Sequence, residues 1–307
     1  MIQIKVQGRL GNQLFQYAYG RVLQEKYYAN EALCAIFPEY YEQAENGFEN
    51  GLRFFNTIYS VEKKLQLNFF QKCILYGYLG IRRGVRKLFK FTPMQRYNFE
   101  LHFVRMMNFF GIYILSTGYY DFRKSRFKNK VIIGPFESAK YFDFVKDDLQ
   151  KEFTPVKEKE ENLQLYNEIT NSESVCISIR RGDFLSDRYK SNFYVCTPQY
   201  FEKAIIKMKQ IVENPRFVVF SDDIEWCKEN LQFPKNTLYE SGKDPVEEKL
   251  RLMYSCKHFI ISNSTFSWWA QYLSKNNNKV VIAPSRWKNS DSPKDIYQEN
   301  WILIDPD

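Results

Sequence analysis

The second half of the chain alternates short apolar runs with stretches of helical pattern, and this alternation constrains the fold more than any other feature. Apolar runs lie at 175–179, 217–220, 259–261, 280–282 and 301–304. A strand buried on both faces of a parallel sheet is typically such a largely apolar run, and helices connect one strand to the next. The sequence therefore predicts an α/β fold.

Polar residues after these runs indicate where helices begin. Thr197 and Pro198 supply an N-cap and a proline at the first helical position. Asp244 and Glu247 have the spacing of a capping box for a further helix. The Ser221-Asp222-Asp223 sequence opens another helix directly after its strand. We expect each of these helices to connect two strands of the sheet, as the crossover connections of parallel strands require.

The first half is less regular. Residues 2–6 alternate as a strand does, a glycine-bearing turn follows, and a helix is expected from Gln13 to about Tyr27. A second strand is expected at 131–133. Between them we expect only short helices, because glycine weakens a long one.

The charged, proline-containing segment 151–162 marks the junction between two domains, 1–153 and 154–307. The net charge of +8 is uneven across them. Residues 63–130 contain 15 Lys and Arg against two acids, a charge of +13, which leaves −5 for the rest of the chain. Nucleic acid, an anionic membrane or a phosphorylated substrate would each explain this basic, aromatic insertion. A solvated helical subdomain is the simpler alternative.

Several classes of protein are disfavoured. No apolar run is long enough to span a membrane. The chain begins directly with a strand pattern, so we expect no signal peptide. Six cysteines form no Cys-x-x-Cys pair, which favours reduced thiols in the cytoplasm. With two histidines, His102 and His258, a zinc site or a Ser-His-Asp triad is poorly supported.

Three polar clusters follow three of the predicted strands: Arg180–Asp183, Ser221–Asp223 and Ser262–Thr265. In parallel sheets ligands bind beyond the carboxyl ends of the strands. Guanidinium groups and helix N-termini both suit the oxygens of a diphosphate. The sequence therefore predicts a site for a phosphate-bearing ligand at this edge.

Four motifs resemble those of bacterial α-1,2-fucosyltransferases of glycosyltransferase family 11. They are GRLGNQLFQY at 8–17, SIRRGDF at 178–184, FSDD at 220–223 and SNSTFSWWA at 262–270. The resemblance implies a GT-B type fold, in which two Rossmann-like domains face each other across a cleft. It also implies transfer of L-fucose from GDP-fucose to the 2-hydroxyl of a terminal β-galactoside in a surface glycan, with inversion.

The resemblance places the donor mainly on residues 154–307 and the acceptor, an oligosaccharide or lipid-linked glycan, on residues 1–153. It implies no cofactor and no metal. Peripheral contact of the basic insertion with the inner face of an anionic membrane would suit a lipid-linked acceptor. The donor-binding residues that it implies are Gly11, Asn12, Gln13, Ser178, Arg180, Ser221, Asp222, Asn263, Ser264 and Thr265.

Within the site, Arg180 is expected to hold the β-phosphate, and Asp222 to meet the guanine edge. Arg181 instead has Asp183 as a possible internal partner, and Asp223 is expected to point to solvent. Each of these residues also has a purely structural reading, as a solvated pair, a turn acceptor or a helix cap.

Ser264 and Thr265 could simply cap their helix without binding a ligand. Trp268 and Trp269 are expected in the core. Gly8 and Gly11 could belong to a plain tight turn, since the third glycine of a dinucleotide fingerprint is absent. Two positions depart from the family pattern: Ser178 stands where the family often has His, and Glu137 where it usually has Gln.

An inverting transferase needs a general base, and Glu137, Asp183 and Asp187 are the candidates. Both histidines are expected to be structural, and Asp305 and Asp307 to belong to a frayed tail. Two alternatives remain: a GDP-sugar transferase with another acceptor or linkage, and a non-catalytic nucleotide- or nucleic-acid-binding protein. No recognised nucleic-acid-binding module accompanies the basic segment, so we expect no nucleic-acid partner.

Overall fold

The computed structural model describes residues 1–307, apart from the side chain of Asn46. The chain folds into two compact units. One comprises Met1–Phe153 and Ser290–Tyr297, and the other comprises Thr154–Asn289 and Gln298–Asp307. The sequence-based division placed the whole of 154–307 in one domain, whereas Ser290–Tyr297 returns to the first unit.

The first unit is built on a parallel sheet with the strand order β3-β2-β1-β5-β4. Its strands are β1 (Ile2–Lys5), β2 (Leu33–Ile36), β3 (Ser60–Val61), β4 (Ile112–Ile114) and β5 (Lys130–Ile133). Ile2, Ile4, Val131 and Ile132 are fully buried, which explains why these strand positions are apolar. The strands expected at 2–6 and 131–133 are thus confirmed.

The helices of the first unit are α1 (Leu10–Tyr27), α2 (Phe69–Leu88), α3 (Pro93–Phe109) and α4 (Lys146–Glu152). Short 3-10 helices lie at Glu39–Gln43, Glu45–Gly47, Gly51–Phe54, Ala139–Tyr141 and Asp143–Val145. The prediction that α1 starts at Gln13 is wrong, because the helix begins at Leu10 and takes Gly11 into its first turn. The buried Gln13 amide donates to the carbonyls of Gly8 and Glu49, and this contact ties the helix start to the loops around it.

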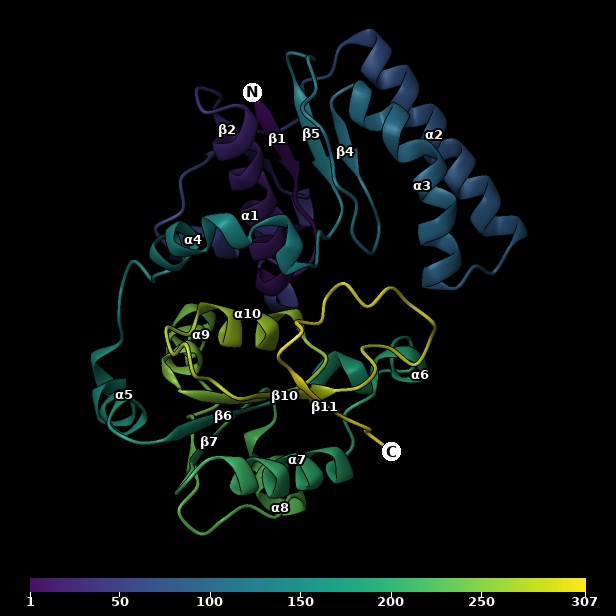
Figure 1. Ribbon diagram of the computed structural model, residues 1–307. Coiled ribbons are helices and arrows are strands. Elements are labelled where there is room, and N and C mark those ends of the chain that lie inside the picture. The colour runs from purple at the N-terminus through teal and green to yellow at the C-terminus, as the bar shows by residue number, and fades with distance from the viewer. The chain divides into compact units, whose positions relative to one another are not determined.

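The expectation of only short helices in the basic insertion is also wrong. The 20-residue helix α2 and the 17-residue helix α3 form an adjacent pair beside β4 (Figure 1). Capping boxes start both helices, at Asn68 with Gln71 and at Thr92 with Gln95. Tyr78 and its neighbours pack against the α3 side, and this burial outweighs the low helix propensity of glycine.

The second unit is built on a parallel sheet with the order β11-β10-β9-β6-β7-β8. Its strands are β6 (Ser174–Ile179), β7 (Arg216–Ser221), β8 (Leu238–Tyr239), β9 (His258–Ile261), β10 (Val281–Pro284) and β11 (Ile302–Ile304). Its helices are α5 (Leu163–Thr170), α6 (Lys190–Phe193), α7 (Pro198–Ile211), α8 (Ile224–Asn230), α9 (Val246–Ser255) and α10 (Thr265–Leu273), with 3-10 helices at Glu160–Asn162 and Gly182–Leu185.

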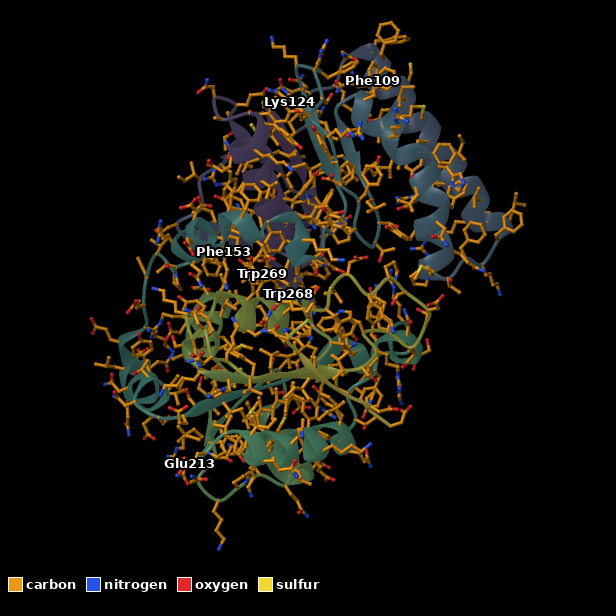
Figure 2. The ribbon with its side chains drawn as sticks, viewed as in Figure 1. Phe109, Lys124, Phe153, Glu213, Trp268 and Trp269 are labelled. Carbon is orange, nitrogen blue, oxygen red and sulfur yellow. The ribbon has the colours of Figure 1, made fainter. Side chains whose placement is uncertain are left out.

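Helices cover both faces of this second sheet, with α9 and α10 on one face and α7 and α8 on the other (Figure 1). Trp268 and Trp269 of α10 are fully buried, as expected (Figure 2). Thr197 caps α7 through the amide of Tyr200, which confirms that helix start. The alternation of apolar runs and helical patterns in the sequence therefore correctly predicted a parallel sheet covered by helices.

Two local predictions in this unit are wrong. Asp244 does not cap α9, because its carboxylate pairs with Lys159 at 2.9 Å and accepts from the Ser241 hydroxyl. The C-terminal acids are not frayed, since Arg286 pairs with Asp305 at 3.4 Å and with Asp307 at 2.5 Å. Within the described residues no helix is long and apolar enough to cross a membrane.

Candidate active site

Three adjacent parallel strands of the second unit, β9, β6 and β7, end at the same edge of the sheet. Strand β6 ends at Ile179 and is followed directly by Arg180. Strand β7 ends at Ser221, next to Asp222, and β9 ends at Ile261. The topology thus brings together the clusters that the sequence placed after three separate strands.

The guanidinium of Arg180 is held between two carboxylates at this edge. Its Nη2 atom lies 2.6 Å from Asp183 Oδ1, and its Nη1 atom lies 2.7 Å from Asp222 Oδ2. A guanidinium carries five N–H donors in a fixed plane, so these two contacts orient the group and use only part of its capacity. Arg180 is 27% exposed and can therefore meet a ligand.

Gly182 allows this arrangement to form. A Cβ atom on Gly182 would lie 2.5 Å from Asp222 Oδ2, a distance that real side chains do not reach. The other carboxylate oxygen of Asp222 accepts a 2.9 Å hydrogen bond from the Arg181 amide. Asp222 is therefore fixed by the turn that also carries Arg180.

Arg181 has a different partner from the one considered in the sequence. Its Nε atom donates to Asp223 Oδ2 at 3.2 Å, and its guanidinium lies 3.2 Å above the Trp226 ring centroid. Asp183 pairs with Arg180 instead. Asp223 also caps α8 through the Trp226 amide, so its carboxylate does not simply point to solvent. These contacts give Arg181 and Asp223 structural roles.

Most of the serine and asparagine side chains predicted to bind the donor make internal hydrogen bonds. The hydroxyls of Ser178 and Ser267 lie 2.6 Å apart, and the Ser221 hydroxyl accepts from the Asp223 amide. The buried Asn263 amide donates to the carbonyls of Phe193 and Trp287. These three predicted residues shape the edge from within the protein.

Ser264 and Thr265 lie at the start of α10 and are half-buried. The Ser264 hydroxyl accepts from the amide of Phe266, which confirms its predicted cap. The first amides of a helix have no partner within that helix, so this position suits an anion. Asp187 is exposed on the loop after the 3-10 helix that contains Asp183.

One charged pair at this edge escaped the sequence reasoning. Lys249 of α9 lies 3.2 Å from Glu240 Oε2 and donates to the Ser221 carbonyl at 3.3 Å. Burial raises the pKa of the Glu240 carboxyl, and Lys249 opposes that shift. No motif in the sequence indicated this pair, because the strand before Glu240 has only two residues.

The first unit has its own carboxyl edge, formed where β1 and β5 end. Gly8, with φ +79°, follows β1, and a Cβ on it would lie 2.3 Å from Asn12 Nδ2. This close approach fixes Gly8 and Asn12 together, which explains the glycine at that position. Gly11 and Gln13 are buried in the first turn of α1, where Gln13 bonds to neighbouring loops.

Glu137 lies on the loop after β5 and is half-buried. Gly134 precedes it with φ +142°, where a Cβ would lie 2.0 Å from the Leu115 carbonyl oxygen. Phe136 has φ +51° and stacks on Tyr19 with ring centroids 4.1 Å apart. Residues in such sparsely populated conformations persist only where packing enforces them. The loop therefore holds Glu137 in a defined place at this edge.

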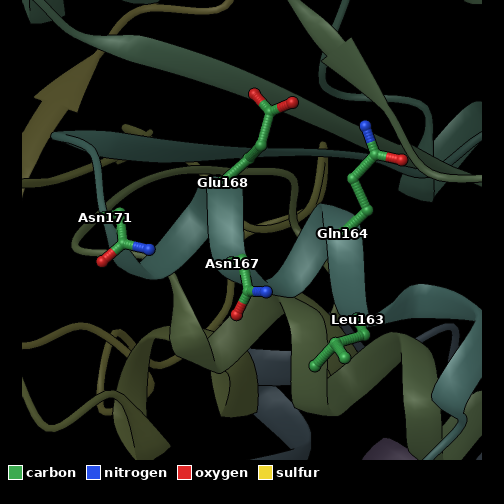
Figure 3. A pocket seen from close by; sticks show the side chains of 5 residues that line it. All are labelled: Leu163, Gln164, Asn167, Glu168 and Asn171. Carbon is green, nitrogen blue, oxygen red and sulfur yellow. The ribbon is translucent and has the colours of Figure 1, made fainter.

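One further feature lies outside these edges. A surface hollow on α5 is lined by Leu163, Gln164, Asn167, Glu168 and Asn171 (Figure 3). None of these is a predicted site residue. Among the described side chains, no group of three or more His, Cys, Asp or Glu is placed to hold a metal ion.

The fold is similar to the crystal structure of fucosyltransferase NodZ from Bradyrhizobium, with a TM-score of 0.54 and 12% identity over 95% of this chain and 98% of that one. At this identity the likeness concerns the fold alone. Two units with helix-covered parallel sheets, together with this likeness, define a glycosyltransferase fold of the GT-B type. The expectation of that fold class is confirmed.

The sequence model described as "Glycosyl transferase family 11" matches residues 1–305, and the chain belongs to this family of glycosyltransferases. It is 27% identical to the alpha-1,2-colitosyltransferase of Escherichia coli over 325 residues, covering 99% of each protein. It is 29% identical to galactoside alpha-(1,2)-fucosyltransferase 1 of Homo sapiens over 143 residues, covering 43% of this chain and 39% of that protein. The family resemblance seen in the motifs is confirmed.

Proposed function

We propose that the protein transfers L-fucose from GDP-fucose to the 2-hydroxyl of a terminal β-galactoside in a surface glycan, with inversion at the anomeric carbon. The observation that carries this proposal is the Arg180 guanidinium, oriented by Asp183 and Asp222 at the carboxyl edge of a parallel sheet. The α-1,2 linkage in the names of both relatives supports it, as does the galactoside in one of them.

Arg180 stabilises the departing GDP. When the bond between the anomeric carbon and the β-phosphate oxygen breaks, negative charge grows on that phosphate. A cation that is already oriented needs no rearrangement at that moment, so it lowers the energy of the transition state more than that of the ground state. The start of α10, with Thr265, supplies further donors for the diphosphate. No metal is required in this scheme.

Asp183 and Asp222 act as positioning residues for Arg180. Both Asp222 oxygens are engaged by the turn, one by Arg180 and one by the Arg181 amide. This geometry favours a positioning role over the predicted contact with guanine. Because Asp183 is paired with Arg180, we assign proton transfer from the acceptor hydroxyl to Asp187, the exposed carboxylate of the same loop.

Glu137 belongs to the acceptor side in this scheme. Its rigid loop at the edge of the first unit suits a residue that selects an acceptor hydroxyl. Kinetics separate the two carboxylates. Asp187→Asn should lower kcat about 10²–10⁴-fold, as loss of a general base does. Glu137→Gln should change KM for the acceptor and leave kcat for the best acceptor nearly unchanged.

The proposed reaction is tested by incubating the protein with GDP-fucose and galactose-terminated oligosaccharides, measuring GDP release, and locating the new bond by NMR. We expect an α-linked fucose on the 2-hydroxyl of galactose. A bond to another hydroxyl would support the same fold with a different linkage. If no sugar donor gave any GDP release, the chain would be a non-catalytic nucleotide-binding protein.

A second donor is favoured by one comparison, because the relative that aligns over 99% of the chain is a colitosyltransferase. Colitose differs from L-fucose by the loss of the 3-hydroxyl group. A site that hydrogen-bonds that hydroxyl rejects the analogue strongly, whereas an apolar site does not. Comparing kcat/KM for GDP-fucose and GDP-colitose therefore decides between the two donors.

A further inference from the structure

The outward face of α2 in the first unit is apolar and aromatic. Its inward face packs through Leu75 and Tyr78 against Met107 and the β4 strand. On the opposite side Phe69, Phe70 and Leu88 are 74%, 67% and 78% exposed, respectively. A surface helix usually presents polar residues to water on that side. Helix α2 therefore has two apolar faces, and only one of them is covered.

Three glycines leave a flat strip between the exposed apolar side chains. With 3.6 residues per turn, Cys73, Gly77, Gly80 and Gly84 share one side of the helix. A Cβ atom on any of these glycines would meet nothing within 4 Å. Exposed aromatic and aliphatic side chains border the strip on both sides: Phe69 and Tyr76 on one, Phe70, Ile81 and Leu88 on the other.

Cations accompany this apolar face, with no acids among them. Between Glu62 and Glu100 the sequence has nine Lys and Arg and no Asp or Glu. Arg82 alone of the α2 cations is paired, at 3.5 Å from the buried Glu100. In the described part of the chain, the four exposed cations of α2 form no ion pair: Lys72, Arg83, Arg86 and Lys87. Their positive charge therefore faces solvent uncompensated.

Exposed apolar side chains beside unpaired cations favour some binding partners of this face over others. A second copy of α2 would place cations against cations, since the helix has no acid to oppose them. A nucleic acid would meet the cations but would leave Ile81 and Leu88 against water. An anionic bilayer surface offers both negative headgroups and an apolar layer directly beneath them.

We propose that α2 is an interfacial membrane-binding helix, which lies in the headgroup region of an anionic bilayer with its glycine strip and aromatic residues toward the acyl chains. Phe70, Tyr76 and Leu88 enter the boundary between headgroups and acyl chains, where aromatic residues are favoured. The cations along the flank contact lipid phosphates. This binding is independent of the transfer reaction, because it needs neither donor nor acceptor.

Sedimentation of the full chain with vesicles tests the proposal. We expect binding to phosphatidylcholine vesicles that contain 30% phosphatidylglycerol, little binding to phosphatidylcholine alone, and release as salt shortens the Debye length. The test variant changes four exposed cations of α2 to Gln: Lys72, Arg83, Arg86 and Lys87. Arg82 is kept, because its loss would leave the buried Glu100 without a partner.

Each cation near an anionic surface strengthens binding roughly five-fold, so the fourfold variant should bind on the order of several hundred-fold more weakly. The matched control loses the same charge from exposed lysines of the other unit: Lys207, Lys209, Lys235 and Lys243. Its binding should fall less than about five-fold. Equal binding to both kinds of vesicle, or an equal loss in both variants, would overturn the proposal.

Cys73 lies on the exposed face of α2 and can carry a fluorescent probe there. It is the one exposed cysteine in the described part of the chain, and the other five are buried. An environment-sensitive fluorophore attached there should brighten and shift to the blue with anionic vesicles, and should not respond to neutral ones. A shift that follows protein concentration without lipid would assign the face to a second copy, and a shift with duplex RNA alone would assign it to nucleic acid. Either result would refute the membrane proposal.

Discussion

Replacing Arg180 with Lys separates the charge of this residue from its shape. Lysine keeps one positive charge but has no planar fork, so it cannot meet Asp183 and Asp222 at once with the geometry of the guanidinium. The two contacts are 2.6 and 2.7 Å long and lie on a side chain that is 27% exposed. Ion pairs at such partly solvated positions contribute about 0.2–1 kcal/mol each, so the variant should lose less than about 2 kcal/mol of stability and stay folded.

Turnover should fall much further than stability. Loss of one preorganised group that stabilises developing charge typically lowers kcat about 10²–10³-fold, which corresponds to about 2.7–4 kcal/mol in the activation free energy. We expect a loss in kcat with a smaller change in KM for the donor, because the charge grows only as the glycosidic bond breaks. GDP release at saturating donor and a urea unfolding curve measure the two effects.

Arg216→Lys is the matched control for this experiment. Arg216 is 28% exposed and pairs with Glu168 at 3.0 Å, but it lies at the beginning of β7, not at its carboxyl end. Its substitution should change both turnover and stability little. If Arg180→Lys were folded and kept near-parental kcat, the guanidinium would have no part in the departure of GDP, and the proposed mechanism would be wrong.

Three further outcomes are expected. Activity should persist in excess EDTA, because Arg180 and the α10 amides neutralise the diphosphate; loss that Mg²⁺ or Mn²⁺ restores would contradict this. Glu248→Gln should cost about 3 kcal/mol at pH 7, because it leaves the buried Arg251 without its closest partner. Burial alone would raise the pKa of Glu248, but hydrogen bonds from Arg251 and Asn162 outweigh it and lower the pKa from 4.5. This stabilisation is therefore present above pH 4.5 and is lost as pH falls through the lowered value. In urea unfolding, the difference in stability between variant and parent should shrink as the pH falls below 4.5. Changing all three exposed α2 glycines to Ala should raise the free energy of unfolding measured in urea by about 0.5–1 kcal/mol per site. A decrease would show that something packs on these glycines.

The parts of the fold that the sequence predicted are those in which local pattern and burial agree. The run at 175–179 is apolar except for Ser178 because β6 lies between β7 and β9 with both faces covered. Thr197 and Pro198 specify a helix start through contacts within four residues, which a sequence displays directly. Such signals are readable because the partners are near in sequence.

The predictions that failed concern elements and side chains whose structure depends on residues far away in the sequence. Helix α2 forms despite its glycines because Leu75 and Tyr78 meet side chains of α3 and β4 about 30 residues further on. Arg181 turned to Asp223 and Trp226, more than 40 residues away, and not to its close neighbour Asp183. The Glu240–Lys249 pair joins a strand end to a helix, and neither residue belongs to a motif. The hydrophobic periodicity of a sequence does not indicate partners that lie so far apart.

The return of Ser290–Tyr297 to the first unit determines how this chain can be dissected. Asp295 pairs with Lys140, and the Asp291 carbonyl accepts from the Met94 amide, so the segment is bonded to residues far earlier in the chain. A fragment that stops at Phe153 would lack both contacts, and its complement would carry the segment without its partners. Covalently, the polypeptide passes between the units three times rather than once. Independent expression of each half therefore calls for grafting these eight residues onto the N-terminal fragment and closing the gap in the other, not for a single cut.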